Sequence, residues 1–168
     1  MDLQPADGIR PARSDDLASI HDAERRPGYD RFTAQWTLAR HRDEFARSDT
    51  RYFVLTREGT ELLGFVILQP IFDPNEGTKL KRIVVSEPGS GVGRRLLSFA
   101  FDWVFSYPGS ERVWLDVFTH NERARHVYRS MGMREDGVLR QAYRMPDGSR
   151  ADRVVMSILR EEWRVCGS

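Results

Sequence analysis

A strand-like run, three closely spaced glycines and a helix-like run follow one another in the middle of the chain. LKRIVV (80–85) precedes Gly89, Gly91 and Gly93, and RRLLSFAFDWVF (94–105) has apolar residues at helical spacing. Glycine accepts positive φ and lets a ligand approach the backbone closely, while the free N–H groups and the dipole at a helix start favour an anion. The pattern therefore predicts either a phosphate-binding turn or a plain connection between a strand and a helix.

Two familiar phosphate-binding motifs do not fit these glycines. The dinucleotide pattern Gly-x-Gly-x-x-Gly has Arg94 at its last position when it starts at Gly89, and Leu96 when it starts at Gly91. The nucleoside-triphosphate loop ends in Gly-Lys-Ser/Thr, but Gly93 is followed by two arginines. What remains is a compact Gly-x-Gly-x-Gly at the start of a helix.

The charge balance and the apolar runs exclude several classes of protein. The 168 residues suffice for about one domain, and 26 basic against 25 acidic side chains leave a net charge of +1, which argues against a nucleic-acid binder. No apolar stretch approaches the roughly 20 residues that span a bilayer, and the N-terminus has no secretory pattern. We therefore expect a cytoplasmic protein without membrane contact.

Cys166 is the only cysteine, and the histidines form no His-Glu-x-x-His motif, so neither a disulfide framework nor a metal site is expected.

The order of apolar periodicities predicts an α/β (α+β) fold in one domain. Helices are expected at 14–24, 33–47, 91–106 and 121–132, and strands at 8–13, 51–72 (a hairpin), 80–85, 113–118, 137–145 and 150–159. Strands come first as a meander and later alternate with helices. We therefore expect a mixed, mostly antiparallel sheet of six or seven strands, with about four helices on its two faces. Ser14 or Asp15 is expected to cap the first helix. The domain is expected to cover residues 8–160, with terminal segments at 1–7 and 161–168.

A second motif follows the glycines further along the chain. In HNERARHVYRSMGM (120–133), Asn121, Ala124 and Tyr128 span two helical turns. Together, LKRIVVSEPGSGVGRRLL and LDVFTHNERARHVYRSMGMREDG resemble the GNAT superfamily of N-acetyltransferases, most of all the branch that includes the ribosomal-protein and small-amine acetyltransferases. The resemblance extends over nearly the whole chain, about residues 9–159, and the order and separation of the two motifs make it fairly specific.

The resemblance implies transfer of an acetyl group from acetyl-CoA, a co-substrate, to a primary amine of a small molecule or of a protein N-terminus. It implies that the backbone of Ile83, Val84 and Val85 pairs with the pantetheine arm of acetyl-CoA. The turn that would hold the pyrophosphate consists of Gly89, Ser90, Gly91, Val92, Gly93 and Arg94. Asn121 would contact the CoA arm, and the Tyr128 hydroxyl would donate to the departing CoA sulfur.

These assignments have simpler alternatives. Tyr128 lies on the apolar face of its helix and could be a core aromatic, and Asn121 could serve only as a helix cap. Pro88 stands where the family pattern usually has Gln or Arg. No general base is assigned, because the nearest carboxylates, Glu76 and Asp116, are expected at the surface.

Other functions are compatible with the same fold. One is transfer of a different acyl group, and another is a non-catalytic role as an acyl-CoA-binding sensor or interaction module. Trp36, expected on the second helix, could line the acceptor site, and Arg94 could be a solvated surface residue. Sheet edges and the C-terminal hairpin permit a homodimer.

Overall fold

Seven strands and five α-helices make up the described part of the chain. The structure, a computed structural model, describes residues 8–166, and the side chains of residues 8–164. The strands are β1 (Ile9–Pro11), β2 (Arg51–Arg57), β3 (Glu61–Leu68), β4 (Thr78–Val85), β5 (Arg112–Phe118), β6 (Arg134–Arg144) and β7 (Arg150–Leu159). The helices are α1 (Leu17–Glu24), α2 (Leu38–Phe45), α3 (Val92–Phe105), α4 (Glu122–Ser130) and α5 (Arg160–Cys166), with short 3₁₀ turns η1 (Ser14–Asp16) and η2 (Tyr29–Arg31). None of the helices within residues 8–166 combines the length and apolar character needed to cross a membrane.

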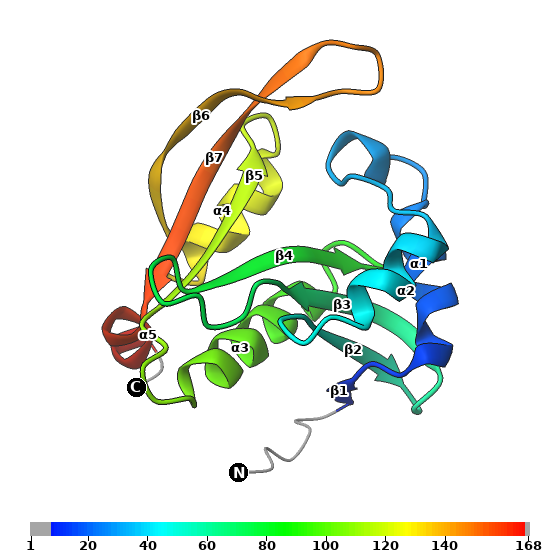
Figure 1. Cartoon of the computed structure of the whole chain (residues 1–168), viewed down its shortest axis with the longest axis horizontal. Helices are drawn as coiled ribbons and strands as arrows, with labels where there is room; N and C mark the ends of the chain where they lie inside the picture. Colours follow the sequence, from blue (N-terminus) through cyan, green and yellow to red (C-terminus); the bar gives the residue numbers. More distant parts are fainter. Residues whose placement is uncertain (1–7, 167–168) are drawn as a thin grey trace.

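The strands form one sheet in the order β1-β2-β3-β4-β5-β7-β6 (Figure 1). All neighbours are antiparallel except β4 and β5, which are parallel and are joined through the crossover helix α3. These two strands pair only at Thr78–Val113 and Lys79–Trp114, and Figure 1 shows them diverging beyond that point. The mixed, mostly antiparallel sheet predicted from the sequence is confirmed.

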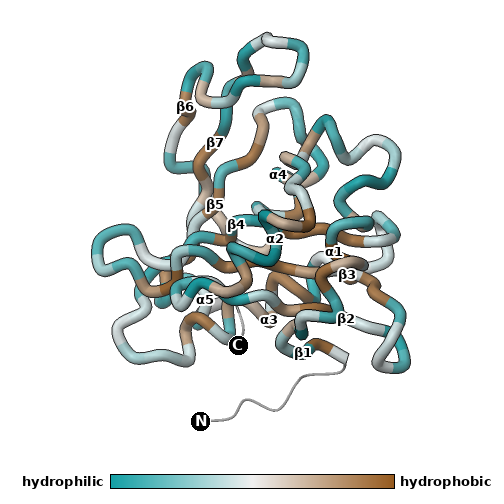
Figure 2. Tube along the Cα trace, turned by 45° about the vertical axis from the view of Figure 1, so that its right-hand side comes forward, coloured by the Kyte–Doolittle hydropathy of each residue, from teal (hydrophilic) through white to brown (hydrophobic). Residues whose placement is uncertain are grey.

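Apolar residues gather in two clusters, one on each face of the sheet. The larger cluster lies between the sheet and α3 and has the fully buried Leu96, Phe101 and Met156 among its members. The smaller cluster packs α1 and α2 against the other face through residues such as Ile20 and Phe65. In Figure 2 the brown parts of the trace concentrate in the central strands and α3, whereas the tip of the β6–β7 hairpin is mostly teal or white. Helices therefore cover both faces, as predicted.

The start of the first helix differs from the prediction. Neither Ser14 nor Asp15 stands at the N-cap of α1: that position is Asp16, which makes no side-chain cap hydrogen bond to the helix. The Asp16 carboxylate accepts a hydrogen bond from the backbone N–H of Arg13 at 2.7 Å. It is also held by the Arg10 guanidinium through two contacts of 2.7 and 2.8 Å. The hydrogen bonds from Arg10 stabilise the charged carboxylate and lower the pKa of Asp16 below its usual value, so Asp16 ties β1 to the turn before α1.

The second helix is shorter than predicted. It begins at Leu38 because the side chain of Thr37 accepts a hydrogen bond from the Arg40 N–H at 3.2 Å. Trp36 therefore precedes the helix instead of lying on it.

The C-terminal helix α5 begins at the predicted domain limit, residue 160, and continues beyond it. Its Trp163 packs against the larger core cluster and donates a hydrogen bond to the Asp102 carboxylate at 2.8 Å. The helix is therefore attached to the body of the domain.

Candidate active site

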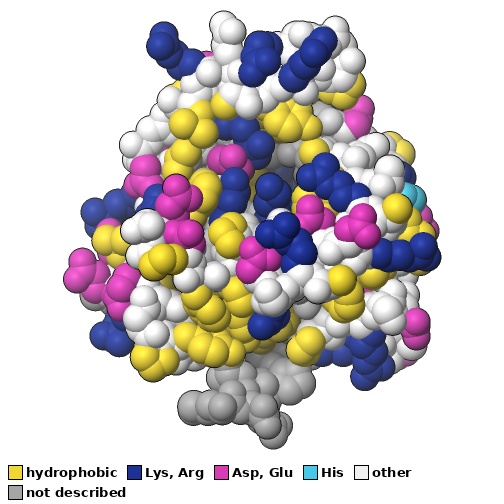
Figure 3. Space-filling view, in the orientation of Figure 1, with side chains coloured by type: hydrophobic (Ala, Val, Ile, Leu, Met, Phe, Trp, Pro, Cys, Tyr) yellow, Lys and Arg dark blue, Asp and Glu magenta, His cyan; other side chains and the backbone are white. Residues whose placement is uncertain are grey.

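A pocket of about 710 Å³ lies where β4 and β5 diverge. Its walls come from the segment 27–40, from β4 and the start of α3, and from β5, α4 and the β6–β7 hairpin. In the space-filling view, the molecule is hollowed between this hairpin and the part below it, and lysine and arginine side chains line much of the hollow (Figure 3). Both sequence motifs therefore contribute to one concave site.

The glycine turn lies at the start of α3 and provides backbone donors there. Gly89 and Gly91 have φ values of 88° and 83°, in the left-handed region that favours glycine. Gly91 is the N-cap of α3, without a capping side chain. The first N–H groups of a helix lack partners within the helix, so they are able to bind an anion. Gly93 belongs to the pocket wall, and a Cβ there would lie 3.5 Å from Val85 Cγ1, an ordinary contact. Packing within the chain therefore does not require glycine at position 93.

Of the six residues of the predicted turn, Gly93 alone belongs to the pocket wall, and Gly89 and Gly91 are exposed beside it. Ser90 and Arg94 are exposed, and the Val92 side chain is buried in the core beneath α3. Sequence reasoning missed Arg123, which lines the pocket. A Cβ on Gly89 would be 3.7 Å from the Arg123 guanidinium, so this cation lies directly beside the turn.

β4 presents an open edge to the pocket beyond its short ladder with β5. The strand stays paired with β3 on its other side. Ile83 and Val85 line the pocket, whereas Val84 packs into the smaller core and is 1% exposed. The Val85 carbonyl accepts a hydrogen bond from the Tyr29 hydroxyl. An open strand edge of this kind is able to pair with another extended chain that carries amide groups.

Tyr128 and Asn121 bring the second motif to the same pocket. The Tyr128 ring packs in the larger core and is 8% exposed, and its hydroxyl makes no hydrogen bond within the described residues. Burial raises the pKa of Tyr128, so the hydroxyl keeps its proton at neutral pH. The Asn121 side chain accepts a hydrogen bond from the Ala124 N–H at 3.2 Å, so it caps α4 as predicted, and it also lines the pocket.

The two carboxylates considered as a base lie in different surroundings. Glu76 is exposed, as expected. Asp116 is not a surface group: it lines the pocket, and its carboxylate is 3.3 Å from Lys79 Nζ and 3.0 Å from the Arg153 guanidinium. Among residues 8–164, no three His, Cys, Asp or Glu side chains gather in a way that could hold a metal ion.

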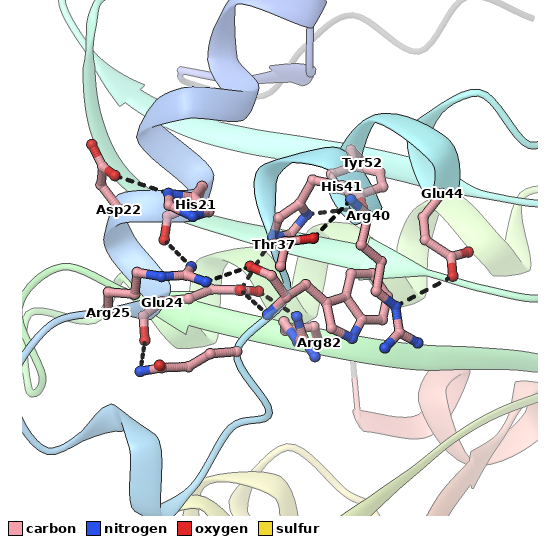
Figure 4. Close-up of polar contacts among 12 residues, drawn as sticks. His21, Asp22, Glu24, Arg25, Thr37, Arg40, His41, Glu44, Tyr52 and Arg82 are labelled. Atoms are coloured by element: carbon pink, nitrogen blue, oxygen red, sulfur yellow. Dashed lines mark hydrogen bonds and ion pairs between the residues drawn. The ribbon is translucent and has the colours of Figure 1, made fainter.

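A buried polar network lies behind one wall of the pocket. Figure 4 shows Glu24, His41, Tyr52 and Arg82 pointing toward one another from α1, α2, β2 and β4. The Glu24 carboxylate pairs with the Arg82 guanidinium and is 3.1 Å from His41 Nε2, which must carry a hydrogen because a carboxylate only accepts. The Tyr52 hydroxyl is 3.2 Å from His41 Nδ1. Sequence reasoning missed this network. The available signal was Glu24 itself, which falls on the apolar face of its helix, four residues after the buried Ile20.

Comparisons with known proteins are consistent with this geometry. The model of the Acetyltransferase (GNAT) family matches residues 17–133. A ribosomal protein bS18-alanine N-acetyltransferase of Haemophilus influenzae is 31% identical over 101 residues, which are 60% of this chain and 66% of that protein, so the chain spans just under two thirds of that relative. The ribosomal-protein-S18-alanine N-acetyltransferase from Escherichia coli has a similar structure, with a TM-score of 0.75 at 27% identity over 90% of this chain and 92% of that chain. The spermidine N-acetyltransferase from Vibrio cholerae in complex with CoA and spermine shares the fold, with a TM-score of 0.79 at 21% identity over 93% of this chain and 96% of that chain. Because the family model covers more than half of its length, the chain belongs to the Acetyltransferase (GNAT) family.

Proposed function

We propose that the protein transfers the acetyl group of acetyl-CoA to a primary amine. The divergence of β4 and β5 is the observation that carries this proposal, because it brings residues of both sequence motifs to one pocket. These pocket residues are Ile83, Val85, Gly93, Asn121 and Tyr128. We propose further that the N-acetyltransferase domain, expected from the sequence at residues 8–160, also includes α5, because Trp163 packs on the larger core.

Three parts of the pocket support acetyl-CoA as the co-substrate. The free N–H groups at the start of α3, with Arg123 beside them, suit the pyrophosphate. The open edge of β4 at Ile83, Val84 and Val85 suits the amide-bearing pantetheine arm. Tyr128, with a hydroxyl that has no partner among the described residues, suits the sulfur. Binding in this way would hold the thioester where an amine can reach it, which lowers the barrier by positioning.

In this proposal the Tyr128 hydroxyl is the general acid: it gives its proton to the departing sulfur, and water returns a proton to it. A thiol of the cysteine type has a pKa of about 8.5, so its thiolate leaves more easily when a donor stabilises it. The raised pKa of Tyr128 keeps the phenol protonated and able to donate as charge develops on the sulfur.

The acceptor ammonium, with a pKa of about 10.4 if it resembles lysine, must lose a proton before it attacks. Asp116 is the one carboxylate in the pocket wall among the described residues, and two cations already hold it. We therefore assign no side chain as the base and propose that water accepts the proton.

The acceptor is either a small molecule or a protein N-terminus. The names of the relatives include both kinds, a ribosomal-protein alanine and spermidine. The cytoplasmic location and the homodimer remain predictions from the sequence.

The test is release of free CoA thiol from acetyl-CoA in the presence of a panel of small primary amines and peptide N-termini, with acetylation of the amine followed by mass spectrometry. We expect thiol release that requires both substrates and is matched by acetylated amine. Binding of acetyl-CoA without thiol release for any amine class would instead favour the non-catalytic acyl-CoA sensor.

A further inference from the structure

Five cationic side chains among the described residues line the part of the pocket that lies away from the glycine turn. They are Arg40, Lys79, Lys81, Arg82 and Arg153. Figure 3 shows dark blue side chains gathered in the hollow. The whole chain has a net charge of only +1, so this positive charge is local.

Carboxylates neutralise only part of this charge. The ion pairs join Glu24 to Arg82, Glu44 to Arg40, and Asp116 to both Lys79 and Arg153. Three carboxylates thus face five cations; Asp116 is shared between two of these cations, and Glu44 is shared between Arg40 and Arg47, which lies outside the wall. Lys81 forms no ion pair with any described residue, so the excess positive charge is centred on its ammonium.

Lys81 has an unusual place in the strand. β3 and β4 pair at Ile67–Arg82 and then at Leu68–Leu80, so Lys81 is the extra residue of a β-bulge. A bulge redirects a side chain relative to its neighbours in the strand, and Lys81 belongs to the pocket wall. Lys81 is exposed at the surface of this open wall, but the protein around it and the neighbouring Lys79 lower the pKa of its ammonium, and a bound anion would offset the repulsion from Lys79.

The neighbouring guanidinium groups are held in place. Trp36 is 3% exposed, and the Arg82 and Arg40 guanidinium carbons lie 4.1 and 4.4 Å from the centre of its ring. Stacking on an aromatic face and the ion pair with Glu24 fix the position of Arg82 before any ligand arrives. The cationic wall is therefore preorganised.

Lys81 lies too far from the glycine turn to bind the pyrophosphate of acetyl-CoA proposed there. The glycine turn follows Val85, and Lys81 precedes Val85 by four residues, which is about 13 Å along an extended strand. Arg123 already provides a cation beside Gly89 for the pyrophosphate. The ammonium of Lys81 is therefore available to a group on the acceptor side.

We infer that the acceptor is a small primary amine that carries an anionic oxygen group, a carboxylate or a phosphate, and that Lys81 binds this group. The inference rests on the proposed acetyl transfer. A polyamine would add positive charge to a wall that already has an excess, which is unfavourable. The same wall lowers the pKa of the acceptor ammonium, because like charges disfavour its charged form. It thereby helps the amine to lose its proton although no unpaired carboxylate is present in the described wall.

Matched amines test the inference through kcat/KM for thiol release. The pairs are phosphoethanolamine with ethanolamine and γ-aminobutyrate with butylamine, and spermidine represents the polyamines. In at least one pair we expect kcat/KM for the anionic amine to exceed that for its matched partner by about tenfold or more, the effect of one charge-assisted hydrogen bond. The pair that shows this preference identifies the anionic group as phosphate or carboxylate. Equal or lower values for both anionic members, or spermidine as the best acceptor, would overturn the inference and leave acetyl transfer standing. No thiol release with any amine would overturn both.

Variants of Lys81 test the assignment of the residue. Lys81→Gln should reduce the preference for the anionic amine by about tenfold, leave the KM for acetyl-CoA unchanged, and be rescued by Lys81→Arg. Arg57→Gln removes the same charge from the exposed Arg57–Glu61 pair on β2 and β3 and serves as the control. An unchanged preference in Lys81→Gln would show that Lys81 does not bind the acceptor.

Discussion

The Tyr128 hydroxyl is the polar group on which the proposed chemistry most depends. The ring lies in the larger core cluster, yet the residue also borders the pocket, and its hydroxyl has no hydrogen-bond partner among the described residues. A hydroxyl without a partner costs free energy where water is excluded, unless a ligand supplies an acceptor. The two interpretations of Tyr128 from the sequence, a core aromatic and a donor to the CoA sulfur, are therefore compatible: the ring packs in the core and the hydroxyl is available to a ligand.

Tyr128→Phe should reduce turnover by roughly 10² to 10⁴, the range for a lost general acid. Affinity for acetyl-CoA and the free energy of unfolding should hardly change, because no hydrogen bond within the described chain is lost and the ring volume is kept. Steady-state kinetics of thiol release measure kcat, and thermal unfolding measures stability. Tyr107→Phe, at a residue that is 41% exposed, is the control and should change neither. Full turnover in Tyr128→Phe, with chemistry shown to be rate-limiting, would remove Tyr128 from the mechanism.

Gly91 and Gly109 form a matched pair for testing the glycine turn. Both have φ of 83°, and a Cβ on either would meet no heavy atom within 4 Å. Alanine at either position should cost about 1–2 kcal/mol in the free energy of unfolding, because of the left-handed backbone. Only Gly91→Ala should also weaken acetyl-CoA binding, since Gly91 caps α3 where the pyrophosphate is proposed to bind. Urea unfolding and titration calorimetry measure the two effects. Equal affinity in both variants would mean that the pyrophosphate binds elsewhere.

Between elements, the strongest polar connection joins α1, α2 and β4 through Glu24. Its side chain is fully buried and contacts His41 from α2 and Arg82 from β4 (Figure 4). Its carboxylate also lies 3.2 Å from the backbone N–H of Trp36, which donates to it. One carboxylate thus sets where α1 and α2 lie against the strand that carries Lys81.

Glu24→Gln should reduce the free energy of unfolding at pH 7 by about 3 kcal/mol or more, because it leaves Arg82 buried without a counter-charge. Burial alone would raise the pKa of Glu24, but the His41 hydrogen bond and the Arg82 charge outweigh burial and lower it. With the folded-state pKa below the unfolded-state value of about 4.3, the contribution is complete above that pH and is lost as pH falls through the folded-state pKa. Urea unfolding at several pH values should therefore show that the difference in the free energy of unfolding between the unchanged protein and Glu24→Gln decreases below about pH 4. The exposed Glu61→Gln is the control, and a gap independent of pH would contradict the assignment.

The elements that could be predicted from the sequence are those set by local patterns. The glycine turn with α3 and the Asn121 cap of α4 each depend on residues a few positions apart, and the structure has both. The Lys81 bulge and the Glu24–Arg82 pair could not be predicted in the same way. The first depends on the register of β4 against β3, and the second joins residues 58 positions apart. Asp116 was expected at the surface because its ion pair with Lys79 joins residues 37 positions apart, which local patterns do not reveal.

The two parts of the sheet share one core although β4 and β5 are paired over a short ladder. The larger apolar cluster includes Phe53 and Leu80 from one part and Leu115 and Ile158 from the other. Side chains packed in one cluster are exposed to water together, so the described chain should unfold in one cooperative transition. A ligand between β4 and β5 would touch both parts and should shift that whole transition.

Acetyl-CoA at about 100 times its dissociation constant should stabilise the protein by roughly 2.7 kcal/mol through linkage. For a domain of this size that corresponds to a rise in melting temperature of about 5–10 °C. Adenosine diphosphate should give a much smaller rise, because it has the pyrophosphate but lacks the arm that would pair with the edge of β4. Differential scanning calorimetry measures both shifts and also shows whether a single transition moves. An equal shift with adenosine diphosphate would mean that the strand edge contributes nothing to binding. No shift with any acyl-CoA would contradict the proposed co-substrate, although the chain would still belong to the family.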